Sequence, residues 1–125
     1  MYRALLLAFA LQAAFPAQAQ VPPYVSGGIG EEERAALLPH RNDFNLQLTF
    51  AARRSGNYLA GVGVSITDGH GIEVLRAESK GPFFFAQLVP DTYTVSATFQ
   101  GETQTRRVKV GPAGAATLAL YWEER

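Results

Sequence analysis

Few side chains in this sequence can do nucleophilic or metal chemistry. The 125 residues include two histidines and no cysteine. A catalytic metal needs about three protein ligands around an open position, and His40 and His70 are too few for that set. Ser65, Asp68 and His70 form a nominal triad, but all three belong to one predicted hairpin that lacks a nucleophile elbow. We therefore expect a protein that is not an enzyme, with no cofactor and no metal site.

The charge balance argues against a nucleic-acid partner. Lysine plus arginine and aspartate plus glutamate each number 11, so the formal net charge is zero. A neutral chain lacks the positive field that attracts nucleic acids or anionic membrane surfaces. The two basic doublets, Arg53-Arg54 and Arg106-Arg107, are far apart in the chain, whereas nucleic-acid binding uses a clustered basic stripe. We expect no nucleic acid among the partners.

The N-terminus has the three regions of a secretory signal peptide. These regions are the cation Arg3, an apolar run at 4–14, and a cleavage segment with Pro16, Ala17 and Ala19. The apolar run is shorter than the roughly 20 residues that a membrane-spanning helix needs. We expect residues 1–19 to be a signal peptide that is cut between Ala19 and Gln20. The product is then exported, periplasmic or secreted, and without cysteine it has neither a lipid anchor nor a disulfide.

Residues 20–42 are predicted as a lead followed by a short helix. The lead contains prolines and glycines that disfavour a regular element, and we expect it to be extended and flexible. Three glutamates at 31–33 complement the dipole at the start of a helix, and Pro39 ends it. A helix of about two turns is too short to be stable alone, so its leucines should pack on the rest of the domain.

Strand signals recur about every ten residues from 43 to 122, which is typical of an all-β sandwich or barrel. The clearest is at 92–99, where Tyr93, Val95, Ala97 and Phe99 alternate with polar residues. We expect seven strands, at about 43–52, 58–67, 72–79, 82–88, 92–99, 103–110 and 115–122, and a short tail at 123–125.

The second of these strands has an unusual face. Val62, Val64 and Ile66 lie on one side, and the other side carries Gly61, Gly63 and Ser65, so it is bare at the two glycines. A strand face without side chains lets another group lie close against the backbone. The return strand at 72–79 shifts its apolar pattern, which predicts a β-bulge or an edge position.

One motif resembles a known family. The residues that carry it are Phe83, Phe85, Leu88, Pro90, Tyr93, Val95 and Ala97. They are similar to the F-x-F-x-x-L-x-P-G-x-Y-x-V-x-A signature of carboxypeptidase regulatory-like domains, with Asp91 in place of the usual glycine. The resemblance implies a seven-stranded Greek-key β-sandwich of the transthyretin type over 43–122, in a stand-alone bacterial exported form. It also implies that Phe83 and Phe85 enter the core and that Phe84 lies outside.

This pattern favours a binding module that lacks catalytic activity. Tyr58, Phe84 and Tyr121 form the candidate binding surface, and the expected partner is another protein of the cell envelope. The alternative is an oligosaccharide, whose rings would stack on these three aromatics and Tyr24. That alternative needs two or three aromatic rings along one flat face. A small hydrolase of the transthyretin fold is a second alternative, but the histidine sites and C-terminal Tyr-Arg-Gly-Ser of the urate-pathway enzymes have no counterpart here.

Overall fold

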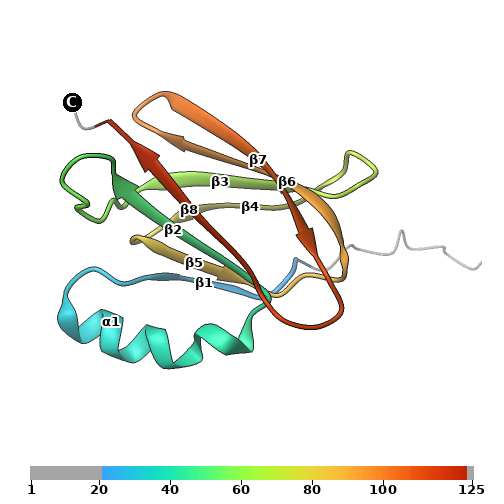
Figure 1. The fold of residues 1–125 in the computed structure, drawn as a ribbon, viewed down its shortest axis with the longest axis horizontal. Coiled ribbons are helices and arrows are strands. Elements are labelled where there is room, and N and C mark those ends of the chain that lie inside the picture. The colour runs from blue at the N-terminus through green and yellow to red at the C-terminus, as the bar shows by residue number, and fades with distance from the viewer. Residues whose placement is uncertain (1–20, 124–125) are drawn as a thin grey trace, which may run out of the picture.

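The computed structural model describes residues 21–123, and they form two four-stranded β-sheets with a short helical segment (Figure 1). The predicted signal peptide and its cut between Ala19 and Gln20 lie outside the described residues. The first sheet has the order β1-β5-β2-β8 and the second β4-β3-β6-β7. The strands are β1 (Tyr24–Gly27), β2 (Leu46–Ala52), β3 (Val62–Thr67), β4 (Glu73–Ser79), β5 (Phe83–Ala86), β6 (Asp91–Phe99), β7 (Glu102–Val110) and β8 (Ala116–Trp122). The predicted all-β architecture of two packed sheets is confirmed.

The described residues contain eight strands, so the expected number of seven is wrong. The additional strand is β1, in the segment that was expected to be an extended lead without regular structure. It pairs antiparallel with β5, from Tyr24 opposite Ala86 to Gly27 opposite Phe83. The four residues of β1 show no clear alternation of their own. Their strand conformation comes from the hydrogen bonds that β5 offers, which is a tertiary effect.

The apolar core lies between the two sheets. Tyr93, Val95 and Ala97 of β6 are buried, as the alternation predicted, and the last two pair with Ile66 and Val64 of the neighbouring strand β3. On the first sheet, β2 is central and pairs with β5 on one side and in parallel with β8 on the other. The single tryptophan, Trp122, is 2% exposed. The centroid of its ring lies 5.9 Å from the ring centroid of Phe50 and 6.0 Å from that of Phe99.

A helical layer covers the outer face of the first sheet. It consists of α1 (Glu31–Leu37) and the 3₁₀ segment η1 (Leu38–Asp43), and Figure 1 shows α1 beside β1 and β5, away from the second sheet. The Glu33 carboxylate accepts hydrogen bonds from the backbone N–H groups of Ile29 and Gly28, and these bonds lower its pKa. The buried Gln47 donates to the carbonyl of Arg41 at 3.0 Å. The predicted short helix is confirmed, and these bonds attach it to the sandwich.

The three phenylalanines of β5 are all buried, which corrects the expected position of Phe84. Phe84 is 0% exposed and pairs with Leu48 on the inner face, inside the main core. Phe83 and Phe85 point to the opposite face of the sheet, where their rings contact Tyr58 and Phe44 respectively. Alternation does separate one phenylalanine from the other two, as expected. The expected facing is wrong because the helical layer makes the outer face apolar here as well.

The hairpin between β3 and β4 has the predicted irregularity. Its register shifts between Ile66 and Thr67, and β4 is one of the two edge strands of the second sheet. The predicted start of β3 at Tyr58 is wrong. Tyr58 instead bridges to Ala51 in the first sheet, and the chain crosses to the second sheet before Val62.

Candidate functional site

Two of the three predicted surface aromatics stand on one face of the first sheet. Tyr58 pairs with Ala51 from one side, and Tyr121 of β8 pairs with the same Ala51 from the other side. Residues that pair directly across a ladder share a face, so both rings stand on the outer face. Their backbones are two strand spacings apart, or about 10 Å. Tyr58 is 52% exposed and Tyr121 is 44% exposed.

The ring of Tyr58 is held by two other elements. Its centroid lies 5.3 Å from that of Phe83 on β5, with an angle of 59° between the ring planes. The guanidinium carbon of Arg34 on α1 lies over the ring, 5.5 Å from the centroid, at the distance of a cation–π contact. Arg34 also donates from Nη1 to the carbonyl of Gly28 at 3.2 Å. The helical layer therefore fixes an arginine beside an exposed tyrosine.

Phe84 is not part of this surface, and neither is Tyr24. Phe84 is enclosed in the core, and the Tyr24 ring stacks on it with centroids 5.3 Å apart. Tyr24 pairs with Ala86 on the inner face, opposite to the face of Tyr58 and Tyr121. The structure thus brings two of the four proposed sugar-stacking rings onto a common face. Arg34 is not among the residues that the sequence predicts for a site, because no local pattern connects a short helix to a distant tyrosine.

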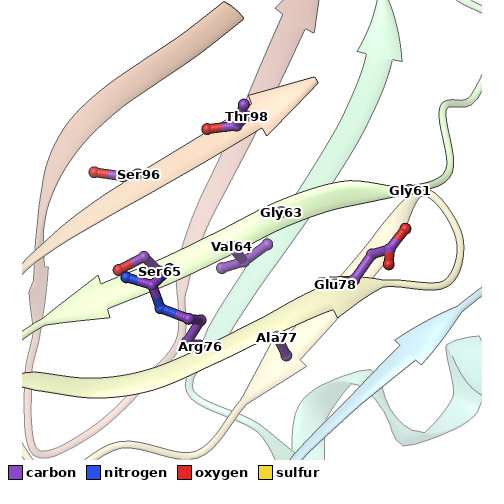
Figure 2. A pocket seen from close by; sticks show the side chains of 9 residues that line it. All are labelled: Gly61, Gly63, Val64, Ser65, Arg76, Ala77, Glu78, Ser96 and Thr98. Carbon is purple, nitrogen blue, oxygen red and sulfur yellow. The ribbon is translucent and has the colours of Figure 1, made fainter. Parts of the chain in front are cut away.

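A second feature is a furrow on the outer face of the second sheet, with a cavity volume of about 420 Å³ (Figure 2). Its floor is Gly63 of β3 together with Gly61, which immediately precedes that strand, and Figure 2 shows side chains of β4 and β6 along its two sides. The lining side chains that carry polar groups are Ser65, Arg76, Glu78, Ser96 and Thr98. The bare glycine face that the sequence predicted is thus the floor of an open polar furrow.

The two glycines of the furrow differ in what the fold requires of them. Gly61 has φ +79°, a conformation that strongly favours glycine. Gly63 does not have a positive φ, and a Cβ there would lie 4.0 Å from the nearest atom, the carbonyl oxygen of Thr98. A larger residue would therefore fit at 63 without strain, although glycine weakens a strand interior. The backbone does not explain why position 63 is glycine.

One charged group of the furrow, Arg76, is paired with Glu73 on the same strand. Arg76 donates from Nη2 to the Glu73 carboxylate at 2.9 Å, and Ser65 donates to the same carboxylate at 2.5 Å. These two hydrogen bonds, the one from Arg76 first, lower the pKa of Glu73. Both charged side chains are exposed, so the pair fixes side-chain positions more than it adds stability.

The nominal triad is not assembled. Asp68 accepts from the backbone N–H of His70 at 2.9 Å and closes the hairpin turn, while Ser65 bonds to Glu73. His40 lies apart from them on η1, with Nδ1 3.3 Å from an Asp43 oxygen. Across residues 21–123 no three His, Cys, Asp or Glu side chains gather in a way that could hold a metal ion. The same residues contain no helix long and apolar enough to cross a membrane.

Comparisons of the chain with protein-family models, with curated proteins and with solved structures gave no match. The chemistry of the two surfaces is therefore the basis for inferring a function.

Proposed function

We propose that this chain is a non-catalytic module that is exported to the cell envelope and binds another protein there. The contact surface in this proposal consists of Arg34, Tyr58, Tyr121 and the exposed Ala119, which lies two residues before Tyr121 on the same face of β8, and we call it the tyrosine face. The observation that carries the proposal is the placement of Tyr58 and Tyr121 on one face, each about half exposed, on either side of Ala51. Tyrosine and arginine are enriched at protein interfaces, where an amphipathic ring or a guanidinium supplies contact area and hydrogen bonds together.

The position of Arg34 favours a protein over a sugar at this face. A sugar platform presents free ring faces, but the guanidinium of Arg34 lies over the ring of Tyr58. A partner with a carboxylate could pair with Arg34 and pack apolar groups on the two rings. The ring of Tyr58 is also held by its contact with Phe83, so this side chain loses little conformational entropy on binding.

Export and family membership belong to the same proposal. The three regions at 1–19 support a signal peptide, and the motif from Phe83 to Ala97 supports a stand-alone carboxypeptidase regulatory-like domain with a transthyretin-type Greek-key topology. Two packed, mostly antiparallel sheets are compatible with that topology. The family resemblance concerns core and turn residues, so it bears on fold more than on ligand.

Site-specific photocrosslinking in the native envelope tests the proposal. A photoreactive residue placed at Ala119 should give one abundant adduct with a single protein, and the Tyr58→Ala/Tyr121→Ala double variant should lose that adduct. Ile72→Ala is the matched control, because Ile72 is 60% exposed and lies outside the tyrosine face. An adduct that persists in the double variant, or the absence of any protein adduct, would overturn the proposal.

An oligosaccharide at the furrow is the second candidate, and Gly63 is the observation that favours it. Glycine leaves room for a sugar ring to lie on the β3 backbone, between hydroxyls of Ser96 and Thr98 and the charged groups of Arg76 and Glu78. A thermal-shift screen with envelope oligosaccharides tests this candidate. We expect a ligand that raises the Tm of the wild type and not of Gly63→Val, and a screen without any such ligand would exclude the furrow as a glycan site.

A further inference from the structure

The four edge strands differ in what borders their outer edge. On one side of the sandwich β7 and β8 run next to each other, and Gln104 donates a hydrogen bond to the carbonyl of Tyr121. On the other side, Ser26 of the short β1 accepts from the backbone N–H of Lys80 at 3.0 Å. The strand β4 has seven residues and pairs with β3 alone among the described strands. An edge of this length presents unpaired N–H and C=O groups that can pair with another strand.

Two copies of β4 that pair antiparallel can place opposite charges against each other. Arg76 and Glu78 are both exposed, and Figure 2 shows them on the same side of β4, flanking Ala77. If a two-fold axis passes through the Ala77 position, Arg76 of each copy lies opposite Glu78 of the other copy. The dimer then contains two Arg76–Glu78 pairs. Directly opposed residues in an antiparallel pair have Cβ atoms about 4.5–5.5 Å apart, within reach of these side chains.

The same register agrees with the burial pattern of β4. Leu75 and Ser79 are buried on the inner face and would lie opposite each other. The small side chain of Ala77 would meet its own copy at the axis. A register displaced by one residue would pair inward with outward positions, which disfavours it. Arg76 uses Nε and Nη2 to bond Glu73, and its Nη1 makes no bond to a described side chain, so one donor is left for the second copy.

The other charged edge is not free to pair in this way. A copy of β7 could oppose Glu102 to Arg106 about Gln104, but β8 runs next to β7 and Gln104 donates to the carbonyl of Tyr121. The strand β8 (Ala116–Trp122) has no charged residue that could select a register. Among the edges of the described sandwich, β4 alone combines free length with a self-complementary charge order.

We propose that β4 pairs with β4 of a second copy of this chain, antiparallel and with Ala77 at the two-fold axis. The second sheets of the two copies then form one continuous sheet, and two Arg76–Glu78 pairs hold the register. The tyrosine face belongs to the first sheet, so this dimer leaves it open and does not depend on the proposed function. One strand pair is a small interface, and association is therefore weak, at about the micromolar to millimolar level.

A charge-reversal experiment on the full chain, expressed in an exporting host, tests this dimer by sedimentation velocity up to about 1 mM protein. The wild type should dimerise as concentration rises. Glu78→Arg alone and Arg76→Glu alone each replace two attractions by two repulsions and should weaken dimerisation about tenfold or more. An equimolar mixture of the two variants restores both opposite-charge pairs between unlike copies, so the mixture should dimerise like the wild type.

Two controls make the result specific. Arg107→Glu makes a charge change of the same size on the outer face of the same sheet and should leave the dimer unchanged. Glu78→Arg keeps the Arg76–Glu73 pair, so this variant stays informative even where Arg76→Glu unfolds. The proposal is overturned by a wild type that remains monomeric at the highest concentration, or by a Glu78→Arg variant that dimerises as the wild type does.

Discussion

Replacing Phe84 with alanine should lower the free energy of unfolding by about 3–5 kcal/mol. Phe84 is 0% exposed and lies in the main core opposite Leu48. A phenylalanine buries about 150–250 Å², which at about 25 cal/mol per Å² corresponds to about 4–6 kcal/mol, and partial collapse of the cavity recovers some of this. A domain of this size has about 5–15 kcal/mol of total stability, so the variant should lose about a fifth of it or more.

The same substitution should act on β1. The Tyr24 ring stacks on Phe84 with an interplanar angle of 17°, and β1 has hydrogen bonds to one neighbouring strand, β5. Removal of the ring therefore takes away a large part of the packing that holds this four-residue strand. We expect hydrogen exchange in Tyr24–Gly27 to accelerate more than exchange in the central strand β2, under conditions where the variant is folded.

Urea unfolding followed by tryptophan fluorescence measures the loss, because the single tryptophan, Trp122, is buried against Phe50. The slope of the transition should stay unchanged while the midpoint falls. Tyr121→Ala is the matched control, since that ring is 44% exposed, and it should change the stability by about 0.5 kcal/mol or less. A loss below about 1 kcal/mol for Phe84→Ala would show that this ring does not lie in the main core.

Three further predictions follow from individual contacts. Tyr93→Phe removes the hydrogen bond from the phenol to the carbonyl of Val89 and should lower stability by about 0.5–1.5 kcal/mol in urea unfolding; an unchanged midpoint would contradict that contact. Gly63→Ala should raise the free energy of unfolding by about 0.5–1 kcal/mol, and Gly61→Ala should lower it by about 1–2 kcal/mol. A Gly61→Ala variant more stable than Gly63→Ala would refute the positive φ of Gly61. Backbone hydrogen bonds from Gly69 and Thr92 lower the pKa of Asp91 below its ordinary value of 3.8, so its contribution to stability is present above that pH and is lost as pH falls below it. Asp91→Asn should therefore flatten the acid side of a stability–pH curve measured by thermal melting, and an unaltered curve would contradict this role.

The sequence predicted those parts of the fold that depend on local alternation. The strands β2 to β8 lie within or close to their expected ranges, because a half-buried strand repeats its apolar residues with period two. The irregular pattern after Gly71 also predicted the register shift in the β3–β4 hairpin. Each of these features is determined by neighbouring residues, which a single sequence displays directly.

The features that the sequence did not predict depend on distant residues. The strand β1 exists because β5 offers hydrogen bonds to it, and the facing of Phe84 was assigned wrongly because a helical layer covers the other side of β5. Alternation indicates that two faces differ, but it does not say which face is toward the core when both are apolar. The pairing of Tyr58 with Ala51 and the contact of Arg34 with Tyr58 likewise join residues on different elements, and no local pattern in the sequence indicates them.

The parallel pairing of β2 with β8 has a consequence for how the chain reaches its folded state. β2 is the first strand after the helical layer, and its partner on one side is β8, the last of the described strands, from Leu46 opposite Ala116 to Ala52 opposite Trp122. Contacts this distant in sequence close late, because a long loop must be ordered before they form. The first sheet is therefore incomplete until the C-terminal strand is available. The proposed export requires the chain to pass through a narrow translocation channel. This topology would keep the core from closing before the whole chain has passed.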